Sequence, residues 1–201
     1  MVGINITTSI LIGSPVEIGG YGFSLKATSF LYFTPIVALI LGEAFGHWFN
    51  DFIANRYIKK HHGLFVPEVR LWPNYLAVAF MIPGLVLTGQ ALQFKWNYGV
   101  IIIGWGMYVF GVMICSVCTT AYILDCYPNA AGEVMGFMNL ARVMGGFSVG
   151  YYQQQWGVQS GFNVSFGIQA VVVAAALGIV VLLQIFGKRV RHKAGPVKLG
   201  W

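Results

Sequence analysis

Five long apolar stretches constrain the fold of this chain more than any other feature. Each approaches or exceeds the ~20 residues that an α-helix needs to cross the hydrocarbon core of a bilayer. They are residues 30–49, 72–92, 99–124, 134–152 and 166–186. A sixth apolar stretch, 2–15, is short and is interpreted as a spanning helix without its N-terminal part. The sequence therefore predicts an all-α integral membrane protein, a bundle of six transmembrane helices whose first helix is truncated.

Composition supports a surface that faces lipid. Only 9% of the 201 residues are charged, whereas a soluble domain typically carries about a quarter. The net charge of +6 does not indicate a nucleic-acid surface, because the basic residues gather in two short polar segments. We therefore expect the lipid bilayer as a partner and expect no nucleic acid.

The positions of Lys and Arg predict the orientation in the membrane. Cytoplasmic segments are enriched in these residues. If the chain after residue 187 is cytoplasmic, nine of the twelve lie on the cytoplasmic side: Arg56, Lys59, Lys60, Arg70, Lys188, Arg189, Arg191, Lys193 and Lys198. Both ends are then cytoplasmic, with a membrane domain at 1–187 and a basic cytoplasmic tail at 188–201.

The segment 50–71 joins two of the expected helices and carries Asp51, several cations and then Pro-Glu-Val-Arg-Leu. A carboxylate is favoured by about 0.3–1 kcal/mol near the positive N-terminus of a helix. Asp51 is therefore expected to approach the N-terminus of another helix. Arg56 is its expected ion-pair partner.

The run 42–70 resembles the loop between helices eight and nine of fungal-type major facilitator superfamily transporters of the drug:proton antiporter kind. In that family the loop is a degenerate copy of a Gly-xxx-Asp-Arg-x-Gly-Arg-Arg motif. The resemblance implies a gating loop whose positions are held by Gly46, Asp51, Arg56, Lys59 and Lys60. It continues through Tyr127-Pro128, Glu133 and 139–142.

The resemblance implies that the chain is the C-terminal half of such a transporter, one half of the family's fold. Its partner would be an N-terminal six-helix half, with a cavity for a small-molecule substrate between the two. The implied function is alternating-access, proton-coupled transport of a small organic solute, at the plasma membrane. We do not expect the chain to transport on its own.

Arg142 is the strongest single candidate for the transport path. It lies near the middle of an expected spanning helix, where a charge costs at least about 2.5–3.5 kcal/mol and tends to face a cavity or a partner. Asn139 lies on the same helical stripe, and Tyr108 is a third cavity candidate. The alternative is a structural charge that only holds the bundle together.

Other polar residues give weaker signals. Glu43 and His47 lie one helical turn apart and form a candidate proton relay, although a structural tether near the cytoplasmic interface is the simpler interpretation. Cys115 and Cys118 have no second pair of ligands, so we expect no metal and no cofactor.

Two other functions stay open from the sequence. One is a non-transporting fragment or regulatory half, made from a truncated or split gene. The other, less favoured, is a membrane-embedded enzyme. Since no nucleophile with an adjacent base is apparent, we expect that the chain is not an enzyme.

Overall fold

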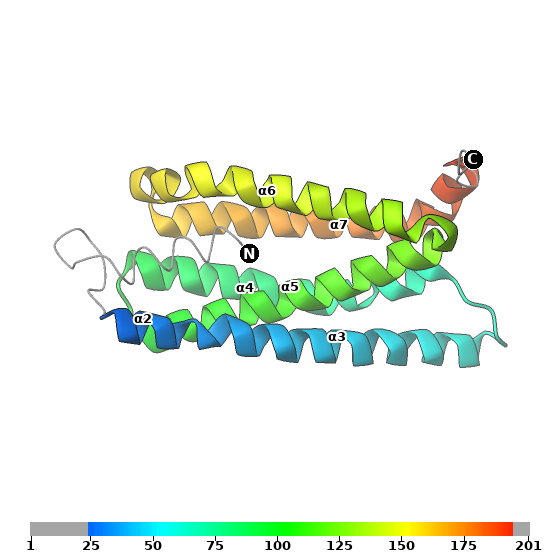
Figure 1. The fold of residues 1–201 in the computed structure, drawn as a ribbon, viewed down its shortest axis with the longest axis horizontal. Coiled ribbons are helices and arrows are strands. Elements are labelled where there is room, and N and C mark those ends of the chain that lie inside the picture. Colours follow the sequence, from blue (N-terminus) through cyan, green and yellow to red (C-terminus); the bar gives the residue numbers. More distant parts are fainter. Residues whose placement is uncertain (1–23, 195–201) are drawn as a thin grey trace.

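The computed structural model describes residues 24–194, and the regular structure within that range is entirely helical. Five long helices lie side by side along one axis (Figure 1). They are α3 (Phe33–Lys60), α4 (Pro73–Gln93), α5 (Tyr98–Cys126), α6 (Ala131–Ser160) and α7 (Phe162–Ala194). A short helix, α2 (Leu25–Leu31), leads into α3, and two 3₁₀ turns, η2 (Pro67–Leu71) and η3 (Pro128–Ala130), precede α4 and α6.

Four helical stretches within residues 24–194 are long and apolar enough to cross a membrane: Lys26–Lys60, Pro67–Gln93, Tyr98–Cys126 and Phe162–Arg189. Each contains the whole of one predicted segment. Helix α6 contains the predicted segment 134–152 and is 30 residues long, yet its Gly- and Gln-rich sequence keeps it out of this group. The predicted segment 2–15 lies outside the described residues. The count of six spanning helices therefore stays a prediction.

Helices α3, α4, α5 and α7 enclose the hydrophobic core. Its most deeply buried large side chains include Leu85 of α4, Trp105 of α5 and Phe166 of α7. Helix α5 packs between α3 and α4 because small residues line both contacts. A Cβ atom added at Gly84 of α4 would lie 2.7 Å from the backbone nitrogen of Tyr108, so the two helices approach almost backbone to backbone. Small residues at such crossings are typical of membrane bundles.

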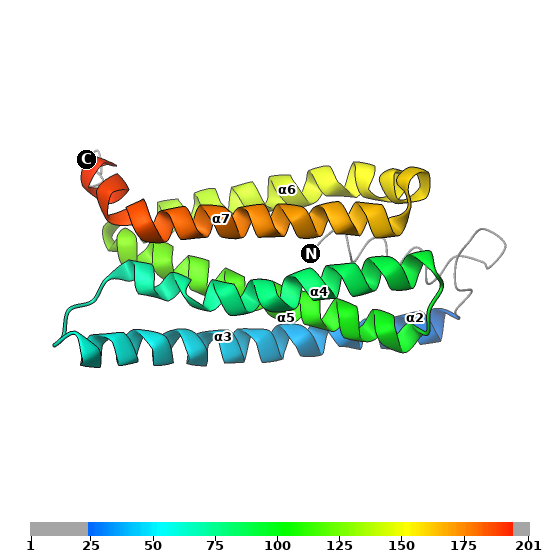
Figure 2. The ribbon, with the colours of Figure 1, turned by 180° about the vertical axis from the view of Figure 1, so that it is seen from behind.

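Helices α6 and α7 form a hairpin beside this core, and both views show them as neighbours (Figures 1 and 2). The turn between them is made by Gly161, whose φ of +89° strongly favours glycine. Side-chain amides then join the helices: the buried Gln153 donates to the hydroxyl of Ser165 at 3.1 Å, and the half-buried Gln169 donates to Gln153 at 2.9 Å. The hairpin is thus held partly by hydrogen bonds, as is common between helices in lipid.

The helix ends that were predicted to be cytoplasmic from the positions of Lys and Arg all lie at one end of the bundle. The C-terminal ends of α3, α5 and α7 lie there, together with the starts of α4 and α6 (Figure 1). The opposite end carries the α4–α5 and α6–α7 connections. The C-terminal ends of α3 and α7 therefore lie at the same end of the bundle.

Candidate functional site

A polar cluster centred on Arg70 joins three elements at this end of the bundle. Arg70 lies on η2, where Pro67 begins the turn. Its Nη1 donates to Asn50 Oδ1 of α3 at 2.8 Å and lies 3.1 Å from Asp51 Oδ1, while its Nε pairs with Asp125 at the end of α5. We call Asn50, Asp51, Arg70 and Asp125 the Arg70 cluster.

The members of the Arg70 cluster differ in their exposure. Asn50 is 1% exposed, and its Nδ2 donates to the carbonyl oxygen of Arg70 at 3.4 Å. The side chains of Arg70 and Asp125 are 21% and 29% exposed, but that of Asp51 is 66% exposed. One guanidinium thus compensates two carboxylates; a hydrogen bond to a charged group contributes about 1.5–3 kcal/mol when partly buried, as at Asp125, and about 0–1 kcal/mol when exposed, as at Asp51. Asp51 keeps a face free to meet another element.

The expected Asp51–Arg56 pair is wrong, since Asp51 pairs with Arg70. The two residues are five positions apart on α3, and side chains on a helix meet at spacings of three or four. Five positions correspond to a rotation of about 140°. Arg56 is instead exposed on another face of the helix.

The other predicted gating-loop residues divide into two groups. Gly46 is buried, and a Cβ atom there would lie 3.3 Å from the Cα of Ile114, so it permits the close approach of α3 and α5. Lys59 and Lys60 are exposed in the last turn of α3, where cations complement the helix dipole. Of the predicted set, Gly46 therefore packs against α5 and Asp51 belongs to the Arg70 cluster.

Three members of the Arg70 cluster, Asn50, Arg70 and Asp125, were not predicted as site residues from the sequence, although Arg70 lies in the Pro-Glu-Val-Arg-Leu run noted there. A signal for Asp125 was present, because the chain has only six acidic residues and this one directly ends an apolar segment on the side predicted to hold Arg70. Asn50 gave no such signal, since its role depends on burial against η2.

Arg142 lies on α6 and reaches across to α5. Its Nη2 donates to the hydroxyl of Ser116 at 3.0 Å. Both Arg142 and Asn139, one turn earlier, are exposed. The structure therefore places these two cavity candidates on one open face between α5 and α6.

Tyr108, the third cavity candidate, lies elsewhere. It is 8% exposed and belongs to the core cluster with Trp105 and Leu85. It precedes Ser116 by eight residues on α5, which is about 12 Å along the helix axis. The structure therefore does not bring Tyr108 together with Arg142.

The candidate proton relay is exposed. Glu43 and His47 both lie on α3 with more than a third of their surfaces accessible, and neither takes part in an ion pair among the described residues. In residues 24–194, no three His, Cys, Asp or Glu side chains gather as a metal site. Among the described residues, Cys115, Cys118 and Cys126 form no disulfide bond.

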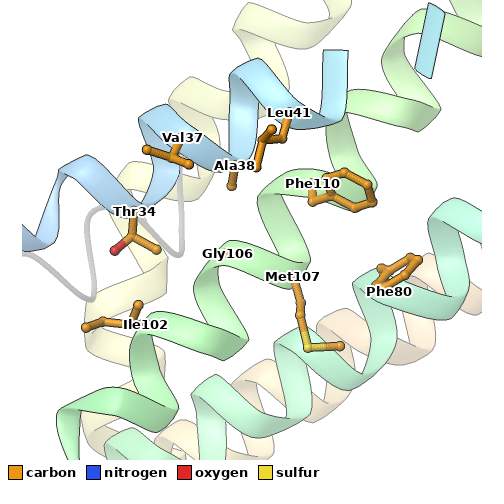
Figure 3. Close-up of a pocket in the computed structure, with 9 residues that line it drawn as sticks. All are labelled: Thr34, Val37, Ala38, Leu41, Phe80, Ile102, Gly106, Met107 and Phe110. Carbon is orange, nitrogen blue, oxygen red and sulfur yellow. The ribbon is translucent and has the colours of Figure 1, made fainter. Parts of the chain in front are cut away.

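An apolar hollow of about 430 Å³ lies on the other side of α5, against α3 and α4 (Figure 3). Thr34 is the only polar side chain among the residues that line it: Thr34, Val37, Ala38, Leu41, Phe80, Ile102, Gly106, Met107 and Phe110. Such a surface can hold apolar groups but offers little to orient a polar solute.

Comparison with curated proteins yields several fungal transporters. The chain is 28% identical to the efflux pump radE of Floropilus chiversii over 186 residues, 89% of this chain and 34% of the relative. It is 27% identical to dityrosine transporter 1 of Saccharomyces cerevisiae over 126 residues, 62% of this chain and 22% of the relative. It is also 27% identical to the MFS antiporter QDR3 of Candida albicans over 123 residues, 61% of this chain and 18% of the relative. The chain is thus similar to fungal transporters of the major facilitator superfamily.

This similarity confirms the predicted resemblance to fungal transporters of this superfamily, and it explains the apolar helices as those of a multi-pass membrane protein. No protein-family model matches the chain. No solved structure matches it significantly. The chain spans only about a fifth to a third of the length of these major facilitator relatives.

Proposed function

We propose that the chain is the C-terminal six-helix half of a transporter that moves a small organic solute by alternating access, coupled to protons. The observation that carries this proposal is the Arg70 cluster. It ties α3, η2 and α5 together at one end. Alternating access by rocking of two bundles needs each bundle to move largely as a rigid body, and such a tie supplies that rigidity.

The exposure of Asp51 fits the second requirement, a contact between bundles. Its side chain pairs with Arg70 and still leaves 66% of its surface accessible. A helix N-terminus of a second bundle can therefore approach it and gain the favourable interaction of a carboxylate with a helix dipole. In this proposal the second bundle is an N-terminal six-helix half, and the cavity lies between the halves, lined by the face of Arg142 and Asn139.

The proposal places both chain ends in the cytoplasm and the protein in the plasma membrane. Six of the basic residues with described side chains support this orientation, because they lie at the end of the bundle assigned to the cytoplasm: Arg56, Lys59, Lys60, Arg70, Lys188 and Arg189. The similarity to an efflux pump and to an antiporter supports outward movement coupled to a second solute, which in this proposal is the proton. The relatives are transporters and not enzymes, so catalysis is not proposed.

Flux in inside-out plasma-membrane vesicles tests the proposal. The complete reading frame that contains the chain is expressed, and uptake of a panel of labelled amphipathic solutes is measured with an imposed proton gradient. We expect uptake of at least one solute to collapse when a protonophore is added. Vesicles that hold the chain alone serve as the control and should show no uptake. Uptake that never exceeds that of vesicles without the protein would favour the non-transporting alternative.

A further inference from the structure

Arg142 lies deep in its helix yet remains exposed. It is the twelfth residue of α6, about 16 Å along the helix axis from Ala131, whereas the hydrocarbon core of a bilayer is about 30 Å thick. A guanidinium at such a depth tends to face a water-filled cavity or a partner rather than lipid. The exposed face around it therefore belongs to a path or an interface.

The positive charge of Arg142 is not neutralised by the acidic side chains that the structure describes. Both ion pairs among residues 24–194 belong to Arg70. Arg142 instead donates a hydrogen bond to the neutral hydroxyl of Ser116. A guanidinium has five N–H donors in a planar fork, so most of its hydrogen-bonding capacity is available to a ligand.

Arg142 is surrounded by uncharged side chains and by open space. Asn139 lies one turn toward the start of α6, and Glu133 is nine residues away, about 13 Å along the axis. One turn in the other direction, a Cβ atom added at Gly145 would meet nothing within 4 Å. No acidic residue of α5 lies near Ser116, because Asp125 is nine positions further on and pairs with Arg70. The face therefore repels cations and has space for a ligand.

We propose that this face, formed by Ser116, Asn139, Arg142 and Gly145, binds the anionic group of the transported solute, a carboxylate held by the guanidinium fork. The inference rests on the proposed transport function. It deepens that function by naming the substrate class. Planar forks of this kind match carboxylates with two parallel hydrogen bonds. The apolar hollow on the other side of α5 offers no competing cationic group among its lining residues.

Charged thiol reagents test the anion preference without knowledge of the solute. In a full-length protein whose native cysteines are replaced by alanine, Ser116→Cys is labelled with an anionic and with a cationic methanethiosulfonate of similar size. Each rate is divided by the rate of the same reagent with a free thiol. We expect the normalised anionic rate to exceed the cationic one by about tenfold, because the guanidinium attracts the anionic reagent and repels the cationic one. This value assumes about 6 Å of water between the two charges. Adding Arg142→Gln should reduce this ratio to about one.

A distant thiol supplies the matched control. Ser160 is exposed at the far end of α6, about 27 Å from Arg142 along the axis and beyond the ~8 Å Debye length at physiological salt. Arg142→Gln should leave the rate ratio at Ser160→Cys unchanged. Equal normalised rates at Ser116→Cys, or no reaction with either reagent, would overturn the anion site.

Flux measurements distinguish a failure of the proposed anion site from a failure of the proposed transport function. For a carboxylate-bearing solute that the vesicles take up, Arg142→Gln should lower flux at least about tenfold at equal abundance, and Arg142→Lys should restore part of it. The uncharged amide analogue should be affected less. If Arg142→Gln reduced the flux of the solute and of its amide equally, the carboxylate site would be refuted, although the transport function would stand. Anion-selective labelling without any flux would instead overturn the transport function and leave the anion site in place.

Discussion

Replacing Arg70 by alanine is expected to abolish transport and to lower the stability of the bundle. The substitution leaves Asp51 and Asp125 near each other without the cation that both contact. It also removes the hydrogen bond to the buried Asn50. We expect a loss of about 1.5–3 kcal/mol in unfolding free energy, the value of hydrogen bonds to charged groups. Thermal unfolding in detergent and vesicle flux measure the two effects.

Arg56→Ala is the matched control, because it removes an exposed arginine from the same segment without touching the Arg70 cluster. It should melt like the wild type. The double variant Arg70→Ala/Asp125→Asn removes one of the two carboxylates and should recover part of the lost stability, which a double-mutant cycle detects. If Arg70→Ala and Arg56→Ala gave the same melting temperature and the same flux, the cluster would have no role in holding the bundle.

Gly84→Val is expected to prevent folding of the core or to lower its stability severely. The first added carbon would lie 2.7 Å from the backbone nitrogen of Tyr108 and 2.8 Å from the carbonyl oxygen of Gly104. Both atoms belong to the backbone of α5, so α4 and α5 must move apart as whole helices. Overpacking of cores costs about 1–3 kcal/mol and occasionally more. The loss is measured as the yield of folded protein, which is extracted from membranes in detergent and analysed by size-exclusion chromatography.

Gly136→Val introduces the same side chain on α6, where an added Cβ atom meets nothing within 4 Å. Its stability should stay within about 0.5 kcal/mol of the wild type, as for exposed substitutions in general. Equal yields of the two variants would contradict the close α4–α5 crossing, whereas a loss confined to Gly84→Val supports it.

The long helices could be predicted from the sequence because crossing a bilayer requires about 20 apolar residues, a constraint that is local in the chain. Helix α6 shows the limit of this signal. Its glycines and glutamines reduce its hydropathy, and its place beside α7 depends on the contacts of Gln153 with Ser165 and Gln169. Because those contacts join residues on two different helices, they produce no periodic pattern in the sequence.

The candidate site was predicted in part for similar reasons. Asp51 could be singled out, because a carboxylate beside several cations at a helix end is conspicuous in a chain with six acidic residues. Its partner could not, since Arg70 reaches it only after the chain turns back through η2. Tyr108 was expected in the cavity, yet the side of α5 on which it lies packs against α4. Which face of an apolar helix becomes core is decided by its neighbours.

Counterflow in proteoliposomes tests the central claim, alternating access, most directly. The complete protein is reconstituted, the vesicles are loaded with a high concentration of unlabelled solute, and a trace of the same labelled solute is added outside. A carrier that exposes one site to each side in turn predicts a transient accumulation of label above its equilibrium level, with no ion gradient imposed. Label that enters only to equilibrium, or does not enter at all, would contradict the account.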